Sequence, residues 1–98
     1  MEKHTPQYPL SEVKACIQAG RVRASTTAIA NAAILNFDFL GMVAVVESLT
    51  MQDFYKSMTS YRDHREWHDV YRPQTNVGEV YLKLTIVEGL LIVSFKEL

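Results

Sequence analysis

The sequence predicts an α+β fold, in which N-terminal helices pack on a mostly antiparallel C-terminal sheet. Three observations lead to this class. Stretches with helical spacing of apolar residues fill the first half of the chain, short aromatic-rich stretches follow from Met51, and two strand-like segments end it. Because 98 residues suffice for one core but not for two, we expect residues 1–98 to form a single domain.

The first candidate helix lies before Gly20, which is its expected stop signal. Ser11 is the expected N-cap. The apolar stripe of this helix consists of Leu10, Val13, Cys16 and Ile17. Because the lone cysteine lies on that stripe, we expect Cys16 to be a packed thiol and not a nucleophile.

Two further helices are predicted after the short extended segment "RVRAS". The first of them is "AIANAAIL", whose small residues allow close packing and whose N-cap is Ser25, Thr26 or Thr27. The other occupies part of "DFLGMVAVVESL", although Gly41 near its start weakens the helical pattern.

Strands are predicted from Met51 onwards, first in "DFYKSM" and then in "EWHDVYR", which Pro73 stops. On the first of these strands, Lys56 shares a face with Phe54 and Met58. These two apolar residues belong either to the core or to a surface on which RNA bases stack.

The chain ends in a predicted hairpin whose turn is Glu88-Gly89. A two-residue turn pairs Val87 with Leu90, and counting back gives the pairs Thr85–Ile92, Lys83–Ser94 and Tyr81–Lys96. In this register the apolar face carries Val80, Leu82, Leu84, Ile86, Leu91, Val93 and Phe95. Glu-Gly is a weaker turn signal than Asn-Gly, and a longer loop would shift the pairing. A half-buried sheet whose lysines face solvent explains the same alternation of residues without any functional site.

Charge and hydropathy exclude several classes of protein. The net charge of −1 disfavours a protein that holds nucleic acid by bulk charge, so any such role must depend on a local cluster. No apolar run approaches the ~18–20 residues of a membrane span, and the first residues lack the apolar segment of a secretory signal. We therefore expect a cytoplasmic protein that does not enter a membrane.

Basic, aromatic and acidic side chains alternate between Asp53 and Arg72, a pattern that a solvated, charge-balanced surface also explains. His64 and His68 are four residues apart, which would suit a metal ion only on a helix. A strand would separate them too far, and no third ligand lies at a recognisable spacing, so we expect no metal and no cofactor.

The remaining candidates are lysine, tyrosine and histidine, which suit metal-free RNA cleavage by the neighbouring 2′-hydroxyl. This reaction needs a proton acceptor, a cation that stabilises the phosphate and a proton donor. Clustered lysines lower one another's pKa, and an imidazole near Lys56 and Lys96 is expected to stay neutral because positive charge surrounds it. His68 is the candidate imidazole.

Long blocks of the chain carry a more specific signal: "MEKHTP", "DFLGM", "DFYKSMTSYRDHREWHDVYRP", "VYLK" and "LIVSFKE". With these blocks the whole chain resembles the motility quorum-sensing regulator (MqsR) toxin family of bacterial toxin–antitoxin endoribonucleases. The resemblance implies a fold like that of RelE toxins and cleavage of mRNA at GCU-like sites without the ribosome. It also implies a cognate antitoxin with a zinc-binding domain and a separate helix-turn-helix domain, through which the toxin would affect operator DNA indirectly. Any zinc would belong to that partner.

The resemblance also implies the site residues. Lys56 and Lys96 would bind and stabilise the phosphate, while His68 and Tyr81 would share proton transfer and positioning. The family pattern has glutamine between Trp67 and Asp69, where this chain has His68. Further candidates for RNA binding are Met58, Arg72 and Lys83. The alternatives are a non-catalytic module that binds an antitoxin and modulates its DNA binding, and a structural protein without a nucleic-acid role.

Overall fold

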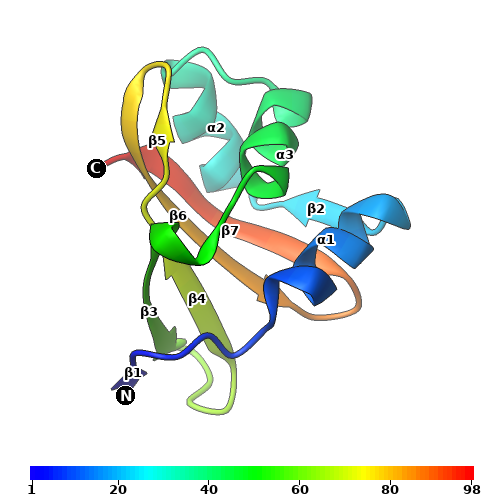
Figure 1. Ribbon diagram of the computed structural model, residues 1–98, viewed down its shortest axis with the longest axis vertical. Coiled ribbons are helices and arrows are strands. Elements are labelled where there is room, and N and C mark those ends of the chain that lie inside the picture. Colours follow the sequence, from blue (N-terminus) through cyan, green and yellow to red (C-terminus); the bar gives the residue numbers. More distant parts are fainter.

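Three helices and a seven-stranded sheet form the computed structural model, which describes residues 1–98 (Figure 1). The helices are α1 (Leu10–Gln18), α2 (Thr26–Ile34) and α3 (Phe39–Glu47), and a short 3-10 helix, η1 (Met51–Asp53), follows them. The strands are β1 (Glu2–Lys3), β2 (Val22–Ala24), β3 (Phe54–Thr59), β4 (Trp67–Tyr71), β5 (Gln74–Thr75), β6 (Gly78–Ile86) and β7 (Leu90–Glu97). The predicted α+β class is confirmed.

The strand order is β1-β3-β4-β6-β7-β2, and β5 pairs with β6 outside this path. Every pair is antiparallel except that of β2 with β7. The extended segment after α1 thus becomes an edge strand. The two-residue strands β1 and β5 were not predicted, because they are too short to show any alternation.

The helix ends agree with the sequence at two of three caps. Ser25 caps α2 by accepting a hydrogen bond from the backbone N–H of Ala28, and Gly20 follows α1 with a φ of +71°. The predicted N-cap Ser11 is wrong, because α1 already begins at Leu10 and Pro9 is its N-cap. The carbonyl of Pro9 accepts the first backbone hydrogen bonds of the helix, and no side chain caps it.

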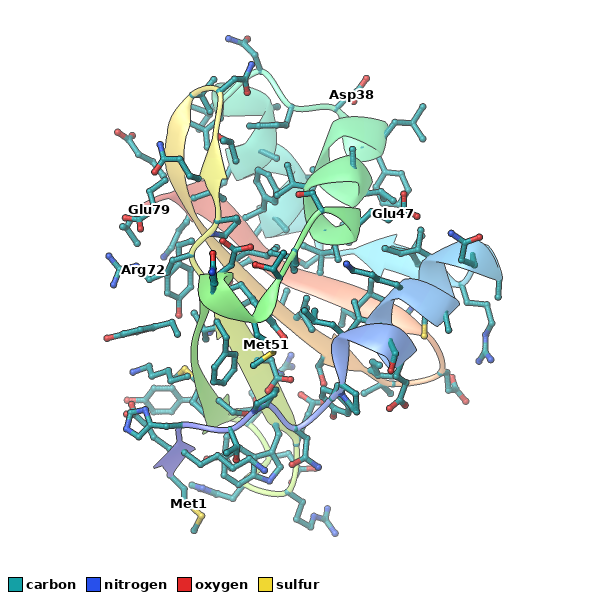
Figure 2. The ribbon with its side chains drawn as sticks, in the orientation of Figure 1. Met1, Asp38, Glu47, Met51, Arg72 and Glu79 are labelled. Atoms are coloured by element: carbon teal, nitrogen blue, oxygen red, sulfur yellow. The ribbon has the colours of Figure 1, made fainter.

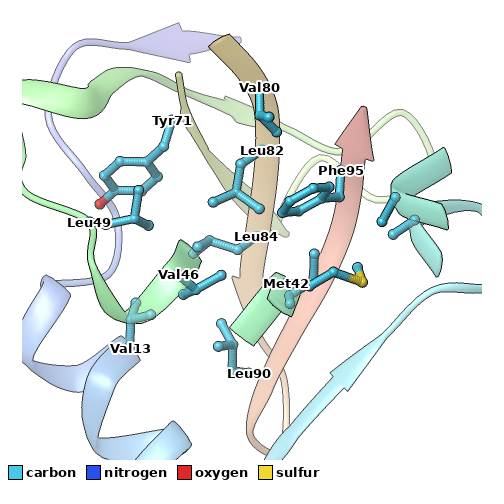
Figure 3. Packing of buried hydrophobic residues seen from close by; sticks show 13 residues of the cluster. Val13, Met42, Val46, Leu49, Tyr71, Val80, Leu82, Leu84, Leu90 and Phe95 are labelled. Carbon is cyan, nitrogen blue, oxygen red and sulfur yellow. The ribbon is translucent and has the colours of Figure 1, made fainter. Parts of the chain in front are cut away.

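The core lies between the helices and one face of the sheet (Figures 1 and 3). Val13 of α1, Met42 of α3 and Phe95 of β7 are among its fully buried members. Cys16 packs against this core as a partly buried thiol, as predicted. The opposite face of the sheet carries no helix, which leaves room there for a site.

No single helix is long and apolar enough to cross a membrane. The helices α2 and α3 reach that length and composition only together, and they are bent by 93° with respect to each other. Both also bury side chains in the core, Ala28 and Ala32 from α2 and Met42 and Val46 from α3.

The predicted register of the hairpin is partly wrong. Ile86, and not Val87, pairs with Leu90, so the loop has three residues, of which Glu88 and Gly89 have positive φ. A bulge on β7 then inserts Val93 between successive pairs. The longer loop and the bulge shift the register in opposite directions and cancel. The predicted pairs Lys83–Ser94 and Tyr81–Lys96 are therefore correct, whereas Thr85 pairs with Leu91 and not with Ile92.

Two bulges also change which side chains reach the core. Because of the bulge at Val93, Leu90 and Ile92 are buried and Leu91 and Val93 are not, contrary to the predicted apolar face. A second register shift, on β3, separates Phe54 from Lys56. Phe54 turns to the core, where its ring meets that of Tyr71 at 5.4 Å, so the predicted face shared by Phe54 and Lys56 does not form.

Candidate active site

Four adjacent strands bring six of the seven predicted site residues to the face without helices. Lys56 of β3 is opposite Val70 of β4, Val70 is opposite Lys83 of β6, and Lys83 is opposite Ser94 of β7. Cross-strand partners share a face, so this row crosses the sheet over three strand spacings, about 14 Å. The same face carries the pairs Met58–His68 and Tyr81–Lys96. We call it the site face; its predicted site residues are Lys56, Met58, His68, Tyr81, Lys83 and Lys96.

Tyr81 and Lys96 are in contact. The Nζ atom of Lys96 lies 5.2 Å from the centroid of the Tyr81 ring, a cation–π distance. Burial is the main reason why the pKa of Tyr81 is raised above its usual value, and the charge of Lys56 acts in the opposite direction. The phenol is therefore protonated at neutral pH and is a hydrogen-bond donor.

Lys56 has a partner that the sequence did not reveal. Strand β1 places Glu2 opposite Met58, and the Nζ atom of Lys56 donates a hydrogen bond to Oε2 of Glu2 at 2.7 Å. This hydrogen bond is the main reason why the pKa of Lys56 is raised. Lys56 is thus a cation at neutral pH and not a base, contrary to the expected effect of clustered lysines.

The lysine whose pKa is lowered, as we expected for clustered lysines, is Lys83. It lies in the middle of the row, half-buried between β4 and β7. Desolvation first, then the positive charges of Lys96 and Lys56, lower the pKa of Lys83. Lys83 therefore has a larger neutral fraction at any pH than a solvated lysine has.

His68 lies on the site face but is only 7% exposed. Its Nε2 atom is 2.9 Å from Oε2 of Glu66, within hydrogen-bonding distance. We had expected positive charge around the imidazole of His68. The ionisable side chain within hydrogen-bonding distance of it is instead a carboxylate, that of Glu66. The loop before β4 supplies this acid, two residues upstream, and so holds the ring in place.

Arg72 follows β4 at the side of the row, and Figure 2 shows it near Glu79, away from Glu47 at the end of α3. Its Cζ atom lies 5.1 Å from the centroid of the Tyr55 ring, and its Nη2 atom lies 3.4 Å from Glu79 Oε2. The same ring lies 5.4 Å from Lys56 Nζ. Tyr55 thus lies next to both Arg72 and Lys56, and it is the residue that the register shift on β3 leaves without a cross-strand partner.

His64 and His68 lie in different parts of the structure. His64 is exposed in the loop between β3 and β4, whereas His68 is buried in β4. No group of three histidine, cysteine, aspartate or glutamate side chains is arranged to hold a metal ion.

Together these side chains form a cationic face suited to a phosphodiester. Two ammonium groups, those of Lys56 and Lys96, lie on this face and can bind phosphate oxygens, and a phenol donor lies beside Lys96. Lys83, with its lowered pKa, adds a group that can accept a proton.

Two comparisons with known proteins identify what this chain is similar to. The family described as "Motility quorum-sensing regulator, toxin of MqsA" matches residues 5–97. The chain is also similar to the mRNA interferase toxin MqsR of Escherichia coli (strain K12), with 54% identity over 97 residues that cover 99% of each chain. The seven predicted site residues all lie inside the range that the family matches, and Glu2 lies just before it.

Proposed function

Because the chain belongs to the family of motility quorum-sensing regulator toxins, we propose that it is the toxin of a type II toxin–antitoxin system. It is an endoribonuclease, an mRNA interferase that cuts GCU-like sites without a metal ion or the ribosome, and thereby arrests translation and growth. The observation that carries the proposal is the site face, which three lysines and Tyr81 share inside the range matched by the family. mRNA as substrate implies action in the cytoplasm.

The reaction is an attack of the RNA's own 2′-oxygen on the adjacent phosphorus, with cleavage of the bond to the 5′-oxygen. Lys56 and Lys96 bind the phosphate and stabilise the negative charge that develops on it. The neutral amine of Lys83 accepts the proton of the 2′-hydroxyl, and its lowered pKa supports this role. The phenol of Tyr81 gives its proton to the departing 5′-oxygen. The products are a 2′,3′-cyclic phosphate and a 5′-hydroxyl.

The other predicted residues bind or position RNA. The half-buried thioether of Met58 contacts a base, and Arg72 contacts a phosphate next to the one that is cut. His68, whose Nε2 atom is within hydrogen-bonding distance of Glu66, positions the RNA and does not transfer a proton.

The family's description as "toxin of MqsA" supports a protein partner of the same kind. This partner is a cognate antitoxin with a zinc-binding domain that holds the toxin and a helix-turn-helix domain that binds operator DNA. The toxin acts on that DNA only through the antitoxin.

The test is cleavage of a defined RNA by the purified chain without ribosomes. One RNA contains a single GCU and its control has this triplet replaced, and the ends of the products are mapped. We expect one cut at the GCU by the wild type, much slower cutting at the same place by Lys96→Ala, and no cut in the control RNA. Intact RNA, together with binding of the antitoxin, would instead identify a non-catalytic module that modulates the antitoxin's binding to DNA.

A further inference from the structure

A cavity of about 180 Å³ opens beside the site face, between β1, the end of β3 and the loop that leads to β4. Its walls include Glu2, Met58, Tyr61 and His64. The volume is below the ~300–1,000 Å³ of pockets for drug-sized ligands, so a ligand there is small or is one part of a larger molecule.

The cavity adjoins the phosphate-binding lysine directly. Glu2 forms one wall and accepts the hydrogen bond from Lys56 Nζ at 2.7 Å. Met58 forms another wall and lies two residues after Lys56 on the same face of β3. A ligand in the cavity is therefore next to whatever Lys56 binds.

Tyr61 has no structural reason to be aromatic. Its side chain is fully exposed in the loop between β3 and β4, so it contributes nothing to the core. An exposed ring beside a half-buried methionine is a suitable surface for an RNA base, because single-stranded RNA is recognised by stacking of unpaired bases on aromatic side chains.

Glu2 adds a chemical preference to this cavity. Its Oε2 atom accepts the hydrogen bond from Lys56, while Oε1 has no partner. A carboxylate accepts hydrogen bonds and donates none when ionised, and Lys56 holds the pKa of Glu2 below its usual value. It therefore favours a base edge that carries an exocyclic amino group, as in cytosine, adenine and guanine, over the carbonyl oxygens of uracil.

We propose that this cavity binds one unstacked RNA base next to the phosphate that is cut, stacked on Tyr61 and Met58, with a preference for bases that have an exocyclic amino group. The proposal rests on the proposed function, since it names the part of the RNA that lies beside Lys56.

The test measures binding separately from cleavage. The RNA carries a 2′-deoxy nucleotide at the cut, so that it binds without being cut, and an abasic nucleotide replaces each neighbouring position in turn. We expect one position where loss of the base weakens binding to the wild type about fivefold or more. Tyr61→Ala should show this weaker binding with the intact RNA and no further loss with the abasic one, whereas Tyr61→Phe should behave as the wild type. Phe39→Ala, an exposed aromatic residue on α3, is the matched control and should change nothing.

The preference for an amino group is tested at the same position with cytosine and uracil. The wild type should bind the cytosine RNA more tightly, and Glu2→Gln should bring the ratio of the two affinities close to one, whatever happens to overall affinity. Equal affinities of Tyr61→Ala and wild type for every RNA would overturn the base site while leaving cleavage, and so the proposed function, intact. Absence of cleavage combined with the expected binding pattern would overturn the proposed function alone.

Discussion

The ammonium group of Lys96 lies 5.2 Å from the centroid of the Tyr81 ring, because the two residues are direct cross-strand partners on β7 and β6. Their contact depends on two irregularities of the hairpin, the three-residue loop and the bulge at Val93. If either occurred without the other, Lys96 would move to the opposite face of β7, since successive side chains alternate between faces. The geometry of this pair is thus determined by the path of the backbone as well as by residue type.

Tyr81 and Lys96 should act as one unit in cleavage. Tyr81→Phe removes the hydroxyl but keeps the ring under Lys96, so we expect about a 100-fold slower cleavage with a nearly unchanged melting temperature. Lys96→Ala, at an exposed position, should slow cleavage without unfolding the protein. The cleavage rate of the double variant should fall by less than the product of the factors measured for the two single variants, because both residues stabilise the same transition state. Single-turnover rates and thermal melts of all four proteins measure this, and parallel losses of stability and activity would indicate a structural role instead.

The sequence predicted the fold well because the periodicity of its apolar residues is local information. Strands and helices followed from it, whereas the bulges on β3 and β7 did not, since a bulge has no alternation of its own. For the same reason the sequence left open whether Phe54 lies in the core, and it did not show that Tyr55 lies beside Arg72. The Tyr81–Lys96 pair was predicted correctly because the longer loop and the bulge on β7, neither of which was predicted, cancel.

The contact of Glu2 with Lys56 could not be predicted, because it joins a two-residue strand to a strand far along the chain. Such a pairing is determined only when the whole sheet assembles. The residue types at the site, by contrast, were recognisable from the blocks of sequence around Lys56, Tyr81 and Lys96.

Cleavage should not require a metal ion. The site face offers lysines, a phenol and an imidazole, and these groups can supply charge and protons without a metal-bound hydroxide. We expect the same rate in excess chelator as in buffer with Mg²⁺, and products that end in a 2′,3′-cyclic phosphate and a 5′-hydroxyl. A rate that chelator abolishes and a divalent ion restores would contradict the mechanism.

Lys83 should produce a dependence of the rate on pH. Because the pKa of Lys83 is lowered, raising the pH deprotonates it before a solvated lysine, and a neutral amine can accept the 2′-hydroxyl proton. At saturating RNA the rate should therefore increase with pH and level off below the usual lysine range. The arginine of Lys83→Arg stays charged over this pH range. Its cleavage rate should therefore not increase with pH and should be about 100-fold lower than that of the wild type. If Lys83 serves only as a cation, Lys83→Arg will keep the rate and the pH profile.

Asp69 should be important for stability and not for chemistry. It is fully buried, and its two carboxylate oxygens accept hydrogen bonds from the backbone N–H groups of Gln7 and Tyr8, each at 2.9 Å. Asp69→Asn replaces one acceptor by a donor, which leaves a backbone N–H without its partner at a cost of about 1–3 kcal/mol. For a domain of this size each kcal/mol lowers the melting temperature by about 4–8 °C. Asp38→Asn is the matched control, because asparagine caps a helix as well as aspartate does, and it should melt within a few degrees of the wild type.

His68 should position RNA without transferring a proton. Its ring is almost fully buried and its Nε2 atom is 2.9 Å from Glu66, so the imidazole is held in place. Glutamine, which the family pattern has at this position, can hydrogen-bond but does not titrate near neutral pH. We therefore expect His68→Gln to keep the pH profile of single-turnover cleavage and to change mainly the apparent affinity for RNA. Glu66→Gln should resemble it, because this change weakens the acceptor that holds the ring. If instead His68→Gln removed the acidic limb of the profile at unchanged RNA affinity, the imidazole would be the proton acceptor, and the role assigned here to Lys83 would be wrong.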